Sequence, residues 1–287
     1  MITETLAWYA DNIPLILTLA AIVIVAVEWL VLARLRRIEQ HREGWVNIFC
    51  GAASFFPVFL LNIIIIMTVM FAFYEMRLFD LGLDWYVWIL AYIAYDFMSF
   101  IVHLASHKVR LLWCMHSVHH SPKEMKASVS FRGSFADFLV TPHTTLWLPL
   151  LGFHPFMVIL MEGVGLLYGI FLHFSDKWMP EYEPRWLRWF FITPSIHRLH
   201  HGNNDSYLDT NYGLMFTLWD RVFNTYQPRI PEVYPTYGLT KELDSANFRI
   251  SQTDEFISLW RDVQNAPRWL DKLSYLFKPP GWSQHVL

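Results

Sequence analysis

Charged residues are scarce in this chain of 287 residues. Lys, Arg, Asp and Glu make up 16% of it, whereas hydrophobic residues make up 54%. Soluble globular domains average about 25% charged residues. The chain also carries 14 Trp and 23 Phe, and large aromatic residues, Trp above all, gather at the two faces of a bilayer. The shortage of charge excludes an ordinary soluble domain and indicates a membrane protein.

Cysteine is scarcer still, because Cys50 and Cys114 are the only two. Two cysteines cannot form the disulfide framework that holds small secreted domains together. Cys114 lies among histidines, where ligation of a metal is conceivable, but we expect it to be a small packed side chain. The formal net charge of −3 offers no basic excess for binding nucleic acid, so we expect no nucleic-acid partner.

Long apolar runs are abundant. The first, residues 13–32, is about 20 residues long, enough to cross a hydrocarbon core of roughly 30 Å. It lacks the basic leader and the small-residue cleavage site of a signal peptide. We expect two more spans at residues 55–73 and 85–104. Two shorter apolar stretches follow, separated by a Gly-Phe-His-Pro segment, and they predict a helical hairpin over residues 138–174 that enters and leaves the membrane on one side.

Charges beside the spans predict the topology. Glu4 and Asp11 precede the first span, and an arginine cluster at residues 34–42 follows it, so the positive-inside rule places the N-terminus outside. The clustered histidines and the C-terminus then lie on the cytoplasmic side. We therefore expect one all-α integral-membrane domain, a polytopic bundle of about three spans and a short helical hairpin. A histidine-rich helical cap at residues 175–287 would complete it on the cytoplasmic side.

The most distinctive pattern is a set of eight clustered histidines. The three groups are His103-Leu-Ala-Ser-His107, His116-Ser-Val-His119-His120 and His197-Arg-Leu-His200-His201. Spacings of three and four residues place such rings on one face of a helix, one turn apart. One histidine at the end of a membrane helix is usually a packed residue. Eight are costly to bury together unless a cation collects their lone pairs, so the pattern predicts a polynuclear metal site.

The number of imidazoles bears on the kind of metal. A structural zinc site is closed by four ligands and often includes thiolates. Eight imidazoles exceed that need, and two ions with open positions are the natural count. Nitrogen-rich sites suit iron, copper, nickel or zinc, so ligand chemistry alone leaves the metal open. Four histidines fall outside the spacing pattern and are interpreted as structural or surface residues: His41, His143, His154 and His285.

The order HxxxH, HxxHH, HxxHH, interleaved with apolar segments, resembles the fatty acid hydroxylase / sterol desaturase superfamily of integral-membrane di-iron enzymes. Within it the chain is most similar to the alkylglycerol monooxygenase subgroup and its bacterial relatives. The similarity runs from about Tyr95 to the C-terminus. It includes the segments 113–121, 193–203, 211–213, 218–223, 237–240 and 277–282. At Lys108 the chain departs from the subgroup, which carries Glu there, and this weakens any shared role for that position.

The resemblance implies two iron ions bound by nine histidines. These are His103, His107, His116, His119, His120, His173, His197, His200 and His201. It also implies hydroxylation of a lipid C–H bond with O2 as co-substrate, the lipid being an alkylglycerol ether in the subgroup. The electrons would come from an external donor, either a tetrahydropterin or a protein of the cytochrome b5 or ferredoxin type.

Two alternatives stay open. Within the same superfamily, the lipid could be a sterol, a carotenoid, a fatty acyl chain or an aminolipid headgroup, and the reaction could be hydroxylation or desaturation. Outside it, the chain could be a non-enzymatic metal-binding membrane protein such as a transporter or a lipid-binding scaffold. A transporter is expected to place ionisable ligands in mid-membrane. Here the histidines gather at one interface, which favours the enzyme.

Residues that orient the ligands can also be predicted, because a ligating histidine donates its other N–H to a carboxylate, an amide or a backbone carbonyl. Asp96 lies two helical turns before His103. Polar residues after the last histidine group could orient rings too: Asn203, Asn204, Asp209, Asn211 and Asp220. From these we select Asn203, Asn211 and Asp220 together with Asp96. Glu162, inside the expected hairpin, either faces a substrate tunnel or pairs with a hairpin partner.

Overall fold

The computed structural model describes residues 2–61, 65–179 and 183–283. Within these ranges the chain is helical, and its β-structure consists of two isolated bridges, Phe191–Phe216 and Gly202–Tyr237. The α-helices are α1 (Ile2–Arg34), α2 (His41–Leu61), α3 (Met67–Glu75), α4 (Trp85–Lys108), α5 (Arg110–His120), α6 (Pro155–Leu172), α7 (Arg185–Phe190), α8 (Pro194–His200), α9 (Leu218–Val222), α10 (Phe248–Asn265) and α11 (Trp269–Phe277). The predicted all-α class is confirmed.

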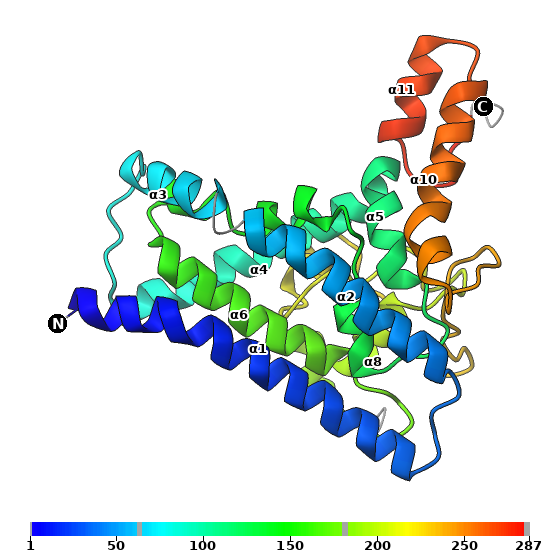
Figure 1. Cartoon of the computed structure of the whole chain (residues 1–287), viewed down its shortest axis with the longest axis horizontal. Helices are drawn as coiled ribbons and strands as arrows, with labels where there is room; N and C mark the ends of the chain where they lie inside the picture. The colour runs from blue at the N-terminus through cyan, green and yellow to red at the C-terminus, as the bar shows by residue number, and fades with distance from the viewer. Residues whose placement is uncertain (1, 62–64, 180–182, 284–287) are drawn as a thin grey trace.

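Three helices are long and apolar enough to cross a membrane: residues 15–34 of α1, the whole of α4 and the whole of α6. Large apolar side chains of α1 face outward, with Leu15 60% and Leu30 68% exposed. Such exposure is favourable only where lipid replaces water. The chain is therefore an integral membrane protein with about three spans. Figure 1 shows α1 and α6 running along one another, with α4 behind them.

The arrangement of the later apolar segments differs from the prediction. The expected span at 55–73 falls on the end of α2 and on α3, and residues 62–64 between them lie outside the described residues. The third spanning candidate is instead α6, which was expected to be half of a short hairpin. The other half is not an α-helix. It consists of the short 3-10 helices η3 (Asp137–Leu139), η4 (Thr141–Thr144) and η5 (Leu148–Leu151).

Proline explains the broken arm of the expected hairpin. Pro142 and Pro149 lie early in η4 and η5, and proline has no N–H to donate to an α-helical ladder. Gly152 then turns the chain towards α6 with φ 106°, a left-handed conformation that glycine adopts without strain. A Cβ at Gly152 would lie 2.2 Å from the carbonyl oxygen of Phe79. The segment thus packs closely against the loop that follows α3.

The core of the bundle lies between α4 and α6. Tyr95 of α4 packs with Met157, Val158 and Met161 of α6 in one buried apolar cluster. The helices approach closely at Gly165, where a Cβ would lie 2.5 Å from the Tyr95 hydroxyl oxygen. Small residues permit such contacts between spanning helices. This packing places the end of α4, which carries His103 and His107, beside the end of α6, which His173 follows.

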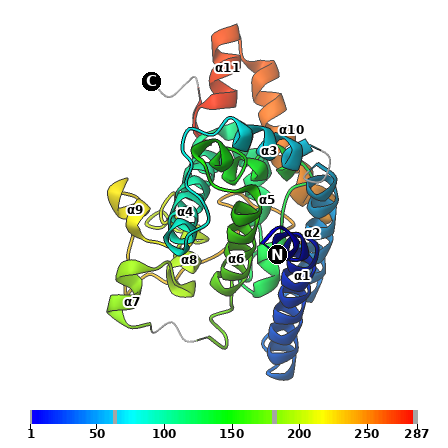
Figure 2. The ribbon, with the colours of Figure 1, turned by 90° about the vertical axis from the view of Figure 1, so that its left-hand side faces the viewer.

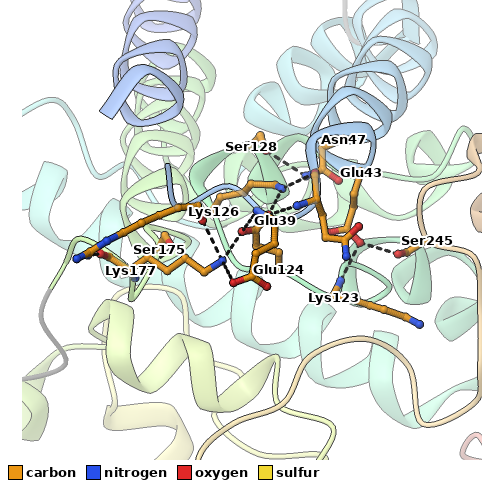
Figure 3. A network of polar contacts seen from close by, with 12 residues as sticks. Glu39, Glu43, Asn47, Lys123, Glu124, Lys126, Ser128, Ser175, Lys177 and Ser245 are labelled. Carbon is orange, nitrogen blue, oxygen red and sulfur yellow. Dashed lines mark hydrogen bonds and ion pairs between the residues drawn. The ribbon is translucent and has the colours of Figure 1, made fainter. Parts of the chain in front are cut away.

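A buried polar network joins the segments around the histidine-bearing ends of the spans (Figure 3). Glu124 accepts hydrogen bonds from the ammonium groups of Lys126 and Lys177, each at 2.6 Å. It also accepts from the backbone N–H groups of Glu39 and Gln40, at 3.1 Å each. Burial by itself would raise the pKa of Glu124, but the bonds from both lysines outweigh it and lower the pKa to about 2. The network ties the α1–α2 turn to the segments after α5 and α6.

Glu28, the one acid inside the first predicted span, is also bound by these segments. Its carboxylate accepts hydrogen bonds from the backbone N–H of Ala127, the backbone N–H of Ser175 at 2.8 Å and the indole N–H of Trp178 at 3.0 Å. A buried acid needs such donors in a medium without water. Glu28 therefore fixes the C-terminal half of α1 to the chain just after His173.

Candidate metal centre

All nine histidines predicted as ligands gather into two adjoining groups. The five-histidine group is His103, His107, His116, His120 and His200. The four-histidine group is His119, His173, His197 and His201. Within each group one nitrogen of every ring lies within 4.8 Å of the others. The groups adjoin where the rings of His120 and His201 stack, with centroids 4.4 Å apart. Ligation of a metal by these residues stays a prediction.

The helices explain the division. In α5, His116 and His120 are four residues apart and share a face, so both enter the five-histidine group, while His119 enters the other. In α8 the order is reversed. His197 and the residue after the helix end, His201, enter the four-histidine group, and His200 enters the other. Each HxxHH motif therefore supplies both groups, as the helical period dictates.

The remaining histidines stand at helix ends. His103 and His107 lie one turn apart in the last turns of α4, and His173 is the residue directly after α6. The short α8 is fixed at its start by Thr193, whose hydroxyl accepts from the N–H of Ile196, and by Pro194 at its first position. Both are common helix-start residues because they satisfy or remove free N–H groups.

Backbone carbonyls orient four of the rings. His103 Nδ1 lies 2.8 Å from the carbonyl oxygen of Tyr212, and His200 Nδ1 lies 2.7 Å from that of Thr210. His173 Nδ1 lies 2.6 Å from the carbonyl oxygen of Gly169, and His119 Nδ1 lies 3.3 Å from that of Arg132. A carbonyl only accepts, so Nδ1 of each ring carries the proton. Nε2 then keeps its lone pair free.

The Nε2 atoms converge at short distances. In the four-histidine group, His173 Nε2 lies 3.0 Å from His197 Nε2 and 3.1 Å from His119 Nε2. In the five-histidine group, His120 Nε2 lies 3.2 Å from the Nε2 atoms of His107, His116 and His200. Metal–imidazole bonds of about 2.1 Å at right angles put two nitrogens about 3.0 Å apart. The spacing thus fits the edges of a coordination shell.

Two further observations fit a bound cation. His103 Nε2 is buried and has no hydrogen-bond partner among the described residues, which is costly for a polar atom unless a metal occupies its lone pair. Burial, followed by the neighbouring imidazoles, also lowers the pKa of the rings on α5 and α8 well below 6.5. Burial lowers the pKa of His173 to about 4. The rings are therefore neutral, which is the form that binds metals.

None of the four residues predicted to orient the rings has a hydrogen bond to an imidazole nitrogen among the described residues. Asp96 accepts hydrogen bonds from the N–H of Met215 at 2.7 Å and the indole N–H of Trp219 at 2.8 Å. Asp220 accepts from the N–H groups of Tyr212 and Gly213, both at 2.8 Å. The two acids hold the loop whose Tyr212 carbonyl orients His103. Asp96 and Asp220 therefore affect His103 only through this loop.

The two predicted asparagines serve loops. Asn203 donates to the carbonyl of Tyr237 at 3.4 Å. Asn211 adopts φ 58° and exchanges two hydrogen bonds with the backbone of Gln227, at 2.8 and 2.9 Å. Short polar side chains suit such turns because they bond to nearby backbone. Both therefore fix the loops around the histidines and leave the rings to other partners.

The carboxylate that does approach a ring is Asp209, whose Oδ1 lies 3.4 Å from His107 Nδ1. Its Oδ2 accepts from the ammonium of Lys108 at 2.7 Å. Burial would raise the pKa of Asp209, but His107 and Lys108 outweigh it and lower the pKa to about 2. Lys108, the departure from the subgroup, thus holds a carboxylate beside a predicted ligand. Asp209 was one of the polar residues considered after the last histidine group, but nothing local in the sequence favours it over the others.

Arg132 supports the site from the side of α5. Its carbonyl oxygen faces His119, and its guanidinium is 1% exposed. The guanidinium donates to the carbonyl of Val118 at 3.0 Å and to the amide oxygen of Asn47 at 2.8 Å. It also donates to the carbonyl of Ser245 at 2.7 Å. The side chain therefore joins α5, α2 and the segment before α10 behind the four-histidine group.

The remaining predicted residues have plainer surroundings. His154 begins α6, where its Nδ1 accepts from the N–H of Phe156 at 3.3 Å. His41 and His143 are exposed, and His285 lies outside the described residues. Glu162 is half-buried on α6 and has no hydrogen bond or ion pair among the described residues, so pairing with a hairpin partner, one of its two alternatives, finds no support.

Cys114 is buried against Leu259 and Tyr275, away from both histidine groups, and burial raises the pKa of its thiol to about 12. A protonated thiol is a poor metal ligand, which agrees with the expected packed side chain.

The family model described as fatty acid hydroxylase matches residues 88–225, a range that contains all nine histidines. Over these residues the chain resembles the fatty acid hydroxylase superfamily. The resemblance inferred from the motifs is thereby confirmed.

Among curated proteins, the chain is 29% identical over 246 residues to the alkylglycerol monooxygenase of Homo sapiens, with 84% of this chain and 53% of the relative covered. It is 28% identical over 242 residues to that of Xenopus tropicalis, with 84% and 52% covered. The ornithine lipid hydroxylase OlsE of Rhizobium tropici is 29% identical over 140 residues, with 48% and 41% covered. The chain thus spans about half the length of the curated relatives it matches. No solved structure matches it significantly.

Proposed function

We propose that this chain is a di-iron oxygenase that hydroxylates a C–H bond of a membrane lipid with O2, and that the lipid is an alkylglycerol ether. The observation that carries the proposal is the convergence of nine neutral imidazoles into two groups at the ends of α4 and α6. The five-histidine group would hold one iron and the four-histidine group the other. When bound, the iron pair would supply the activation of dioxygen and the removal of hydrogen from an unactivated C–H bond.

The chain's own residues would supply geometry. The carbonyls of Tyr212, Thr210, Gly169 and Arg132 fix the ring tautomers so that every Nε2 of those rings faces its group. Burial keeps the rings neutral and excludes water from the centre. One oxygen atom would enter the C–H bond and the other would leave as water, with two electrons from a donor and two protons. At the carbon beside an ether oxygen the product would be a hemiacetal, which breaks down to an aldehyde and a glycerol.

The proposed topology puts the histidines and the C-terminus on the cytoplasmic side and the N-terminus outside. It is supported by Arg34 at the end of the spanning part of α1 and by Arg36 and Arg37, which follow it. The same end of α1 binds the histidine region through Glu28 and Ser175. Basic residues favour the cytoplasmic side. A cytosolic electron donor, either a tetrahydropterin or a cytochrome b5 or ferredoxin type of protein, would then reach the centre directly.

The choice of lipid rests on coverage. The alkylglycerol monooxygenases match 84% of this chain, whereas the ornithine lipid hydroxylase and a cholesterol 25-hydroxylase-like protein of Danio rerio each match 48%. These two relatives keep an aminolipid headgroup and a sterol as the alternatives. A carotenoid or a fatty acyl chain, and desaturation in place of hydroxylation, stay open as further alternatives within the superfamily.

The test uses purified protein reconstituted with single lipid classes under labelled oxygen, with tetrahydropterin or reduced ferredoxin as donor. We expect about two iron ions per chain, and one labelled oxygen atom in the product of an alkylglycerol. His120→Ala should abolish turnover, because Nε2 of His120 lies at the centre of its group. His154→Ala, outside both groups, should retain it. Zinc alone, or metal without oxygen consumption on any lipid, would favour a non-enzymatic metal-binding protein instead.

A further inference from the structure

The C-terminal helices α10 and α11 form a hairpin that projects from the bundle. Both views show it extending away from the bundle (Figures 1 and 2), and Figure 1 shows it crosswise to α6. It is joined to α5 through a small core in which Leu259 of α10, Tyr275 of α11 and Cys114 are buried. The rest of its surface has few neighbours. The hairpin is thus held at its base and stands beside the histidine-bearing end of the spans.

The outer face of α11 is apolar and uncovered. Trp269, Leu273 and Phe277 are spaced one turn apart and are 67%, 42% and 61% exposed. Asp271 and Tyr275, on the opposite face, are buried. No described residue covers the outer face. A water-soluble helix normally turns its apolar stripe inward. The exposed apolar face of α11 therefore indicates a binding partner outside the described chain.

The charges of the hairpin are unevenly satisfied. Its four acids all have partners in ion pairs: Asp254 and Glu255 with Lys241, Asp262 with Arg110, and Asp271 with Arg268. Four cations of the hairpin and the turn after it form no ion pair with any described residue: Arg249, Arg261, Lys272 and Lys278. The uncompensated charge is therefore positive. An anionic surface is the complementary partner.

Exposed apolar side chains also lie where α10 meets the bundle. Phe256 of α10 packs on Phe135, with ring centroids 6.1 Å apart. Phe135 is 47% exposed, and Leu139 in η3 is 57% exposed. Beside this contact α10 lines an open groove of about 540 Å³ with Arg249, Thr253, Ile257 and Trp260. An apolar strip flanked by a guanidinium matches the two parts of a phospholipid.

We propose that the α10–α11 hairpin lies in the interface of the same bilayer that the spans cross, with the face of Trp269, Leu273 and Phe277 among the upper acyl chains and its free cations at anionic phospholipid headgroups. Helices with Trp, Phe and Leu on one face and Lys or Arg beside them bind membranes in this way. The exposed apolar side chains around α10 and the uncompensated positive charge favour a lipid surface over a second copy of the chain. The hairpin would then anchor α5, and with it three of the nine histidines, at a fixed depth.

The test places a nitroxide on single cysteines of the full chain. Cys50 and Cys114 are buried, so added cysteines are labelled selectively. Leu273→Cys and Phe277→Cys report the outer face, and Glu242→Cys, where the carboxylate is 97% exposed, is the control in water. In vesicles with about 30% anionic phospholipid, the labels at 273 and 277 should collide mainly with dissolved oxygen. The label at 242 should collide mainly with a water-soluble nickel chelate.

Labels at 273 and 277 that are as open to the chelate as the label at 242 would overturn the proposal. So would dipolar broadening between two copies of a label, because it would identify a second chain as the occupant. Lys272→Glu with Lys278→Glu should expose the label at 273 in anionic vesicles, whereas Lys272→Arg with Lys278→Arg should not. Equal exposure in the two pairs would refute the role of charge. None of these readouts depends on iron content or turnover, so they are independent of the proposed reaction.

Discussion

Arg132→Met should destabilise the protein strongly, because it removes a buried charge on which several elements depend. The guanidinium donates to the carbonyls of Val118 and Ser245, to the amide oxygen of Asn47 and to the hydroxyl of Ser251, at 2.7 to 3.0 Å. The Val118 carbonyl keeps the Ser121 hydroxyl at 2.7 Å and the Ser245 carbonyl keeps the Ser251 hydroxyl at 3.4 Å, whereas the Asn47 amide oxygen has no second donor among the described residues. A buried acceptor left unpaired costs about 1–3 kcal/mol.

The sum is reduced because methionine no longer requires a cation to be buried. A net loss of about 1–3 kcal/mol remains. For a chain of this size each kcal/mol lowers the melting temperature by roughly 2–4 °C, so the midpoint should fall by at least about 2 °C.

The assay is thermal unfolding of the detergent-solubilised protein, followed by the loss of the monodisperse peak in size-exclusion chromatography. Arg249→Met is the matched control, because Arg249 lies on α10 and has no ion pair with a described residue. Its midpoint should move by no more than about 1 °C. Equal shifts for the two variants would refute the reasoning. Since the Arg132 carbonyl orients His119, iron content at low temperature should also fall in Arg132→Met and stay unchanged in Arg249→Met.

Three further predictions concern the ring orientation, the polar network and the helix contact. Asp209→Asn should weaken iron binding by about tenfold, because His107 loses its charged partner. Chelator titration measures the iron affinity, with Asp205→Asn as the control. An unchanged affinity in Asp209→Asn would contradict the role of Asp209. The pKa of Glu124 is lowered from 4.5 to about 2. The stabilisation that the Glu124 carboxylate gives the fold is therefore complete above pH 4.5 and is lost as the pH falls towards 2. Glu124→Gln should lower the melting temperature at pH 6 and make no further difference near pH 2. Gly165→Ala should cost about 1–3 kcal/mol through its contact with Tyr95. Gly169→Ala should be tolerated, because a Cβ there would meet Leu214 only at 4.0 Å. Unfolding midpoints that fall alike in both variants would rule out the close approach of α4 and α6.

The histidine pattern could be interpreted from sequence because its information is local. Residues three and four apart lie on one helical face whatever surrounds the helix, so the HxxxH and HxxHH spacings predict shared sites. His173 was added by the family resemblance alone. The division into two groups could not be predicted, since it depends on how α5 and α8 face one another.

The partners of the rings were harder to predict. Every residue has a carbonyl, so nothing in the sequence marks Tyr212, Thr210, Gly169 and Arg132 as the ones that accept from Nδ1. Asp96 was selected by helical spacing, but a carboxylate binds whichever donors its environment brings near, and here these are the backbone around Met215 and the indole of Trp219. Tertiary contacts decided these pairings.

The apolar runs predicted the membrane but only part of its helices. Hydropathy cannot distinguish an α-helix from a series of short helical turns of the same composition. Residues 137–151 therefore look like part of an α-helical hairpin until their prolines are considered. Residues 155–172 appeared too short for a span when counted as half of a hairpin, yet α6 is one of the three candidates. Length decides such cases only when the boundaries of the helix are known.

The alternation of histidines along α5 and α8 makes the two proposed metal positions inseparable. A small rotation of either helix about its own axis would carry rings towards one position and away from the other. Neither position could therefore be retuned for a different ion, or emptied, without straining its neighbour through the same helical turn. Such a centre should be filled and lost as a pair, and mutations should alter the spacing between the ions less readily than the affinity for both.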